Sequence, residues 1–272
     1  MQYKNIQGLD VPEIGLGTYK LHDRECSQIV RAALDIGYRH IDTAQMYKNE
    51  RSIGEALSVS NVPREDIFLS TKIWHTNLEA DDVLQSTEES LRQMDTPYVD
   101  LLMIHWPNDQ YDLRSTIESM LVLRDQGKAM NIGVSNFPLH MLKKVKEQIR
   151  APIFCDQVEF HPFIDQLDLL DYAIENDIMV TAYSPLAQGK VMQNKELQEI
   201  GEKYGKSPAQ ISLRWLIEQE NVVAIPKASS EEHLKENFDV FDFFLEDEDF
   251  DRIDQMEKNT RLVNPSFAPD WG

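Results

Sequence analysis

The chain has 272 residues, of which 42% are hydrophobic and 27% charged, a composition typical of an ordinary globular protein. Its 27 Lys and Arg residues against 47 Asp and Glu give a net charge of -20, which argues against a nucleic-acid-binding surface. Two cysteines, Cys26 and Cys155, are too few for a disulfide framework, and no stretch approaches the roughly 18 apolar residues of a membrane span. We therefore expect a cytoplasmic protein without nucleic-acid or membrane partners.

Short apolar runs alternate along the chain with amphipathic stretches of helical period. The helical stretch Asp81–Met94, for example, carries apolar residues at spacings of three and four. Strands too apolar to leave one face in water predict a parallel sheet covered by helices, and eight such units predict a closed (β/α)8 TIM barrel. We expect a single domain over residues 1–272. The eight expected strands are Glu13–Leu16, His40–Asp42, Ile67–Lys72, Val99–Ile104, Met130–Val134, Phe154–Val158, Met179–Tyr183 and Val222–Ile225.

Extra helices are expected near the last two barrel units. Two helical stretches, Asn194–Lys203 and Ser207–Gln219, lie between the seventh and eighth strands. The second begins with Ser207-Pro208-Ala209-Gln210, which combines a capping box with proline at the first helical position. The acidic run Glu246–Asp251 predicts the negatively charged first turn of a last helix.

Four polar residues stand at or just after the ends of three expected strands. Asp42, Lys72 and His105 end their strands, and Tyr47 follows Asp42 by five positions. Because barrel strands deliver their carboxyl ends to one mouth, these side chains should meet there. The Lys72 ammonium, held by Asp42, should lower the pKa of the Tyr47 phenol from its usual value of about 10. His105 could then orient a carbonyl oxygen toward Tyr47. We interpret the four residues as a carbonyl-reducing site, whose electrons would have to come from a cofactor.

Two other functions compete with this interpretation. One is a metal-dependent barrel hydrolase, but that hypothesis leaves Tyr47 and Lys72 without a role, and we expect no metal. The other is a nicotinamide-binding, reductase-like barrel with little turnover and a regulatory or structural role. The metal ligands of the hydrolase hypothesis would be His40, Asp42, His105 and His161.

Six specific motifs are spread along nearly the whole chain. They are Gly15-Leu16-Gly17-Thr18-Tyr19, Gly37-Tyr38-Arg39-His40-Ile41-Asp42-Thr43-Ala44 with Tyr47 and Asn49-Glu50, Thr71-Lys72-Ile73-Trp74, Ile104-His105-Trp106-Pro107, Ile132-Gly133-Val134-Ser135-Asn136-Phe137 and Ile225-Pro226-Lys227. In their order and spacing these motifs resemble the aldo-keto reductase family. The ending Arg261-Leu262-Val263-Asn264-Pro265 with Ala268-Pro269-Asp270-Trp271 looks most like that of the bacterial 2,5-diketo-D-gluconate and methylglyoxal reductases of this family.

The resemblance implies an NADPH-dependent reductase of small aldehydes and ketones. It makes Tyr47 the acid, with Lys72 and Asp42 tuning it and His105 orienting the substrate. Many relatives carry an arginine where this chain has His233, a weaker and pH-dependent cation, so NADH is less firmly excluded. An exposed helix residue is the alternative interpretation of His233.

The resemblance also assigns the cofactor contacts. Ser135, Asn136 and Gln157 would hydrogen-bond the nicotinamide carboxamide, and Tyr183 would stack on the ring. Residues for the 2′-phosphate would lie near the N-terminus of a helix that begins near Ser230. The implied cofactor residues are Thr18, Ser135, Asn136, Gln157, Tyr183, Ser184, Leu186 along the pyrophosphate path, Lys227, Ser229, Ser230 and His233 at the 2′-phosphate, and Glu236 and Asn237 near the adenine.

Aromatic residues next to the strand ends are expected to form the substrate pocket. Tyr19, Trp74 and Trp106 would wall it, and Trp271 would close it from the C-terminal tail. Arg261 could attract a substrate carboxylate, although a surface ion pair is the favoured role. We expect a monomer.

Overall fold

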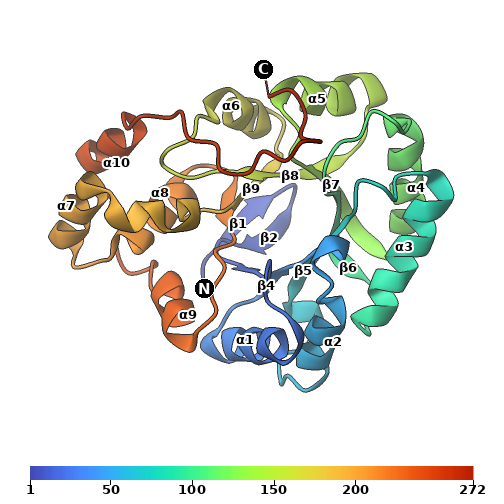
Figure 1. Cartoon of the computed structure of the whole chain (residues 1–272), viewed down its shortest axis with the longest axis horizontal. Coiled ribbons are helices and arrows are strands. Elements are labelled where there is room, and N and C mark those ends of the chain that lie inside the picture. Colours follow the sequence, from blue (N-terminus) through green and yellow to red (C-terminus); the bar gives the residue numbers. More distant parts are fainter. Residues whose placement is uncertain (272) are drawn as a thin grey trace.

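The computed structural model describes residues 1–271, and its central element is a curled parallel sheet ringed by helices (Figure 1). Within these residues the sheet has eight strands, in the spatial order β10-β9-β8-β7-β6-β5-β4-β3, which is sequential order throughout. A parallel bridge from Ile14 to Ala224 joins the first strand region to the last and closes the barrel. The strands are β3 (Leu16–Gly17), β4 (His40–Asp42), β5 (Phe68–Ile73), β6 (Val99–Ile104), β7 (Ala129–Ser135), β8 (Ile153–Glu159), β9 (Met179–Tyr183) and β10 (Val222–Ala224).

The (β/α)8 barrel predicted from the sequence is confirmed, and the strand bounds differ from expectation by at most a few residues. Most of the expected first strand, Glu13–Leu16, joins its neighbour as an isolated bridge rather than a regular ladder. The backbone of Gly15 and Gly17 still donates across this seam, to the carbonyl oxygens of Ala224 and Pro226.

A β-hairpin at the N-terminus was not expected from the sequence. Strands β1 (Tyr3–Ile6) and β2 (Leu9–Pro12) pair antiparallel around Gln7 and Gly8, which have φ of 51° and 81°. Positive φ at both central residues is typical of a two-residue hairpin turn. The sequence signal for such a turn is Asn-Gly or Asp-Gly, and this chain has Gln-Gly there instead. Ile6 and Val11 pack with side chains of the barrel interior, so the hairpin covers the amino-terminal end of the barrel.

Helices surround the sheet on its outer side (Figure 1). Expected starts are confirmed at α8, where both halves of the Ser207–Gln210 capping box form, and at α10, whose first turn is acidic. No helix within residues 1–271 is long and apolar enough to cross a membrane. The helices are α1 (Asp23–Ile36), α2 (Glu50–Ser58), α3 (Ala80–Gln93), α4 (Leu113–Asp125), α5 (Leu139–Lys143), α6 (Leu167–Glu175), α7 (Lys195–Tyr204), α8 (Pro208–Glu218), α9 (Glu231–Phe238) and α10 (Asp247–Asp254).

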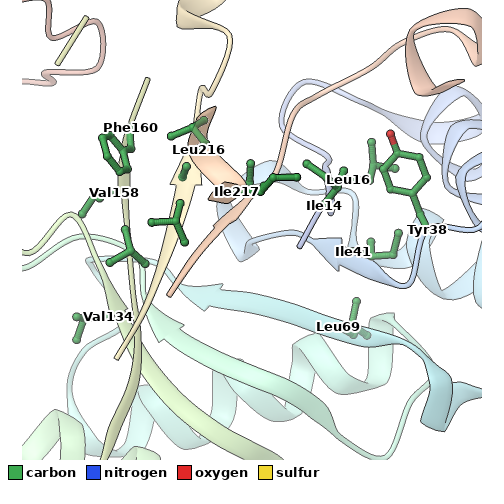
Figure 2. Close-up of a cluster of buried hydrophobic side chains, with 14 of the residues drawn as sticks. Ile14, Leu16, Tyr38, Ile41, Leu69, Val134, Val158, Phe160, Leu216 and Ile217 are labelled. Atoms are coloured by element: carbon green, nitrogen blue, oxygen red, sulfur yellow. The ribbon is translucent and has the colours of Figure 1, made fainter. Parts of the chain in front are cut away.

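Side chains along each strand point alternately outward, into the apolar core, and inward, toward the barrel interior. Ile41 and Leu69 point outward and join the apolar layer between sheet and helices, as Figure 2 shows. Their neighbours on the strands therefore point into the barrel. Near the amino-terminal end most inward residues are apolar, for example Phe68, whereas toward the carboxyl end they are Asp42 and Lys72. The inward-pointing side chains at the carboxyl ends of the strands thus form a polar mouth at that end of the barrel.

Where the barrel closes, the backbones of the first and last strand regions lie so close together that we expect Gly17 to tolerate no side chain. A Cβ atom there would lie 2.6 Å from the backbone oxygen of Ile225, which cannot move without opening the seam. We expect Gly17→Ala to lower the free energy of unfolding by about 1–3 kcal/mol, as overpacking does. Urea denaturation measures this. The control is Val59→Ala at an exposed position, with an expected change within about 0.5 kcal/mol, and equal losses in the two variants would contradict the prediction.

Candidate active site

The centre of the barrel mouth is a buried ion pair. Lys72 Nζ lies 2.7 Å from Asp42 Oδ2, and the two side chains are 0% and 2% exposed. The ammonium also donates to the backbone oxygen of Thr43 at 2.8 Å. Burial acts to lower the pKa of Lys72, and the carboxylate of Asp42 opposes that shift. The pair is stable only because each charge has its partner at hydrogen-bond distance.

The Asp42 side chain and backbone connect four strand ends. Its Oδ1 accepts from Ser70 Oγ at 2.7 Å and from Gln157 Nε2 at 2.8 Å, while its backbone oxygen accepts from Thr18 Oγ1 at 2.8 Å. These partners come from β5, β8 and the loop after β3. Asp42 therefore holds the mouth together, and one N–H group of the Gln157 amide and the hydroxyl hydrogen of Thr18 are already engaged.

Tyr47 lies at the end of a short 3-10 helix, Gln45–Tyr47, that leads out of β4. Its ring centroid is 5.2 Å from Lys72 Nζ and 5.6 Å from the centroid of the His105 ring. Burial, followed by the negative charge of Asp42, holds the pKa of Tyr47 well above its usual value. The expectation of a lowered pKa is therefore wrong for this structure, because burial of the phenol acts most strongly and the Lys72 charge is paired with the Asp42 carboxylate 2.7 Å away.

His105 is a buried and neutral imidazole. Burial, with Lys72 and His75 as further causes, holds its pKa well below the usual range. Nδ1 is buried and has no hydrogen-bond partner among the described residues. The backbone is fixed, because the His105 oxygen accepts from Asn136 Nδ2 at 2.9 Å and its nitrogen donates to Ile73 at 3.0 Å.

A second hydrogen-bonded group lies at the ends of β7, β8 and β9. The Tyr183 hydroxyl donates to Asn136 Oδ1 at 2.7 Å, and Asn136 Nδ2 donates to Ser135 Oγ at 3.1 Å. Ser135 Oγ in turn donates to the backbone oxygen of Gln157 at 2.8 Å. Asn136 adopts φ of 62°, a left-handed conformation that asparagine tolerates better than most residues. The group presents oxygen acceptors to the space in front of it.

A cavity of about 770 Å³ brings most of the expected site residues together. Lys72 stands behind its wall and is fully buried. The expected residues that line it are Thr18, Tyr19, Asp42, Tyr47, Trp74, His105, Trp106, Ser135, Asn136, Gln157, Tyr183, Ser184, Leu186 and Lys227. Sequence reasoning missed Gly17, Lys20, Met46, Pro185, Gln188, Gly189, Ile225, Pro226, Leu262, Val263, Asn264, Pro265 and Phe267. Several are chain neighbours of expected residues, and that adjacency was the available signal.

The C-terminal tail lines the cavity with a different aromatic residue from the expected one. Phe267 is part of the wall, and its ring stacks on His75 at a centroid distance of 4.3 Å. Trp271 is absent from the lining. It lies 6.1 Å from the Trp106 ring and donates from Nε1 to Asn264 Oδ1 at 3.0 Å. Trp271 thus supports the tail from the side rather than closing the pocket.

Among residues 1–271, Arg261 contacts the aromatic ring of the tail, and no ion pair with an acidic side chain is described. Its guanidinium lies 3.7 Å from the centroid of the Trp271 ring, and Nη1 is buried without a hydrogen-bond partner. Burial lowers its pKa, and the charge of Glu159 acts in the opposite direction.

Besides Lys227, five residues are expected around the adenine and the 2′-phosphate. All five lie outside the cavity lining, either in α9 or just before it in the chain. Ser230 caps this helix, since its Oγ accepts from the backbone nitrogen of His233 at 3.2 Å. His233 and Ser229 are exposed, and Asn237 is buried. Glu236 accepts a hydrogen bond from Ser207 Oγ at 2.6 Å.

The hydrolase hypothesis has no supporting geometry. Within residues 1–271, no group of three or more His, Cys, Asp or Glu side chains could hold a metal ion. His40 is buried, and burial lowers its pKa to about 4, so it is a neutral interior histidine.

The barrel and the position of its cavity are those of an enzyme. Barrel enzymes place their active sites at the carboxyl ends of the strands, where this cavity lies. Residues 13–258 match the Aldo/keto reductase family, and the chain belongs to that family. It is therefore an oxidoreductase.

Similar proteins include two bacterial reductases. The chain is 40% identical to glyoxal reductase of Bacillus subtilis (strain 168), over 94% of this chain and 92% of the relative. It is 36% identical to methylglyoxal reductase DkgB of Escherichia coli O157:H7, over 96% and 99%. A solved structure assigned as a 2,5-diketo-D-gluconic acid reductase B superimposes with a TM-score of 0.97 at 39% identity, covering 100% of this chain and 98% of the other.

The buried pair predicts a large cost for removing one charge. We expect Lys72→Met to lower the free energy of unfolding by about 3–5 kcal/mol, because Asp42 would remain buried without its counter-charge. Urea denaturation measures this. Arg51→Met is the control, since Arg51 and Glu55 form a pair whose side chains are 83% and 58% exposed, and it should cost under about 1 kcal/mol. Similar losses of unfolding free energy in both variants would contradict the prediction.

Proposed function

We propose that this chain reduces small aldehydes and ketones to alcohols with NADPH, and that Tyr47 donates the proton. The observation that carries the proposal is the convergence of three groups at one end of the cavity. The Tyr47 ring lies 5.2 Å from the Lys72 ammonium and 5.6 Å from the His105 ring, and both Tyr47 and His105 line the cavity. A phenol and an imidazole on one side of a pocket suit a carbonyl oxygen placed between them.

The inner wall of the cavity fits a nicotinamide. Both N–H groups of Asn136 and one N–H group of Gln157 are used within the protein. Gln157 Oε1, and Asn136 Oδ1 beside its bond from Tyr183, can still accept hydrogen bonds. Acceptors at this place suit the NH₂ group of a carboxamide. The ring of Tyr183 lines the same wall and offers a flat surface for stacking. When bound, reduced nicotinamide supplies the hydride.

The raised pKa of Tyr47 is compatible with its role as donor. The phenol is fully protonated at neutral pH, so it carries the proton that the substrate oxygen needs. An oxygen that gains negative charge as its carbon is reduced becomes far more basic than a phenolate. Once Tyr47 has given up the proton, the nearby Lys72 ammonium stabilises the phenolate more than it stabilised the neutral phenol.

His105 and Asp42 position other groups: His105 the carbonyl oxygen of the substrate, and Asp42 the Lys72 ammonium. His105 stays neutral because of its burial, so its imidazole can donate one hydrogen bond to a carbonyl oxygen without taking the proton from Tyr47. Asp42 holds the Lys72 ammonium and, through Ser70 and Gln157, the neighbouring strand β5 and the strand β8 across the barrel.

Aromatic side chains make the outer wall, which favours small carbonyl compounds. Tyr19, Trp74, Trp106 and Phe267 line the cavity together. Relatives named for glyoxal and methylglyoxal reduction support compounds of this size as substrates. We propose 2-oxoaldehydes as the first compounds to test.

Preference for NADPH over NADH should be modest. Lys227 is an exposed cation at the cavity rim, but Glu231 and Glu232 form the first turn of α9 and disfavour a nearby phosphate. Lys235 offsets one of these charges, 2.7 Å from Glu231. The Oγ of Ser230 is already engaged as the helix cap.

We also propose that the protein acts as a monomer in the cytoplasm. Both cysteines are free and buried, as expected in a reducing compartment. A net charge of -20 opposes self-association.

Loss of the Tyr47 hydroxyl should remove catalysis and spare binding. We expect Tyr47→Phe to lower kcat for methylglyoxal by about a hundredfold or more, the scale of a positioned acid. NADPH binding, measured by quenching of tryptophan fluorescence, should stay within about twofold, because the inner wall is unchanged. Tyr172→Phe removes an exposed hydroxyl bonded to Glu147 and is the control. Full activity of the Tyr47 variant would refute the role of this residue.

An added charge at position 233 should sharpen cofactor choice. We expect His233→Arg to tighten NADPH binding by about three- to tenfold and to leave NADH binding unchanged, since only NADPH carries the 2′-phosphate. Dissociation constants for both cofactors give the ratio. His140→Arg places the same charge at another exposed site and should change neither. An unaltered ratio in the His233 variant would show that this residue does not face the phosphate.

A further inference from the structure

A buried carboxylate at the end of β8 binds the backbone of the C-terminal tail. Glu159 is the last residue of β8 and is fully buried. Its Oε1 accepts from the backbone nitrogen of Leu262 at 2.7 Å, and its Oε2 accepts from that of Val263 at 2.9 Å. One side chain therefore connects two segments that lie about a hundred residues apart in the sequence.

The orientation of this carboxylate is fixed from the barrel side. His161 Nδ1 accepts from the backbone nitrogen of Phe163 at 3.2 Å, so the ring proton lies on Nε2. His161 Nε2 then donates to Glu159 Oε1 at 3.0 Å. Gln166 Nε2 holds the backbone oxygen of Glu159 at 2.8 Å. The carboxylate thus meets the tail in one preset position.

Glu159 is ionised, so both of its carboxylate oxygens can accept hydrogen bonds. Burial acts to raise the pKa of Glu159, but the hydrogen bonds from His161, Leu262 and Val263 outweigh it and leave the pKa below its usual value. Hydrogen bonds to an ionised acceptor are among the stronger ones in proteins.

The tail segment that these bonds hold is part of the cavity wall. Residues 262–265 and Phe267 line the cavity. Among the described contacts of residues 262–268, the two bonds to Glu159 are the hydrogen bonds that reach the barrel strands. Figure 1 shows the tail (red) running from α10 across the barrel toward β8. Phe267 reaches Trp74 and Trp106 only through ring contacts at 5.7 and 5.6 Å.

We infer that Glu159 is a positioning residue that sets substrate affinity by fixing the C-terminal tail as the wall of the pocket. It contacts neither the reacting atoms nor Tyr47. Its effect passes through the backbone of Leu262 and Val263 to the place of Phe267. The kinetic part of this inference rests on the proposed reductase function, whereas the order of the tail can be measured without turnover.

The test is Glu159→Gln in the full-length chain. Glutamine keeps the size of the side chain but turns an NH₂ group toward one backbone N–H, so at least one bond is lost. We expect KM for methylglyoxal to rise about tenfold, the scale of one hydrogen bond to a charged group, with kcat changed by less than about threefold. Amide hydrogen exchange in residues 260–271 should accelerate while exchange in the barrel strands stays slow.

The matched control is Glu218→Gln in α8. Glu218 Oε1 likewise accepts a backbone hydrogen bond, from Leu245 at 2.9 Å, in a part of the chain that does not line the cavity. It should leave KM and tail exchange as in the parent. A rise in KM of equal size in both variants would overturn the positioning role, because it would mark a general loss of stability.

A second variant keeps the inference testable if Glu159→Gln does not fold. Val263→Pro removes one donor N–H from the tail side and should raise KM and tail exchange in the same way. In a chain carrying both changes, the two effects should not add, because each breaks the same contact. Unchanged tail exchange in both single variants would overturn the inference whatever the activity. Faster tail exchange in a chain without reductase activity would instead contradict the proposed function alone.

Discussion

The contact between Lys72 and Asp42 is the constraint on which the rest of this site depends. Two charges that are 0% and 2% exposed can coexist in a barrel interior only when they pair closely and their remaining bonds are satisfied. Asp42 meets that condition with donors from Ser70 and Gln157. Because these residues come from different strands, the need to satisfy one buried carboxylate also sets the relative positions of β4, β5 and β8.

Burial then decides the protonation states around this pair. It raises the pKa of Tyr47 and lowers that of His105, so both groups are neutral in the free pocket. A neutral phenol holds a proton to give, and a neutral imidazole can hold an oxygen without competing for that proton. The chemistry proposed here therefore needs no unusually acidic side chain. The ammonium matters most after the phenol has lost its proton.

The sequence could predict the barrel and the inner half of the site from local features. Strand ends such as Asp42, Lys72 and His105 are marked by an apolar run that stops at a polar residue, and barrel geometry brings such ends together. The tail could not be placed this way. Phe267 and Trp271 lie four residues apart in an irregular segment, so no period indicates which of them faces the cavity. The N-terminal hairpin was missed for a similar reason, since its Gln-Gly turn carries a weak signal.

The amino-acid sequence by itself determined the order of the barrel strands and their helices, which follows from periodicity, a local property of the chain. The ends of the expected strands indicated Asp42, Lys72 and His105, and the motifs indicated the family by resemblance. Only the tertiary structure decided the charge states of Tyr47 and His105, the commitment of Gln157 to Asp42, and the bond of Glu159 to the tail. Each of these depends on burial or on partners far away in the chain, and neither can be read from neighbouring residues.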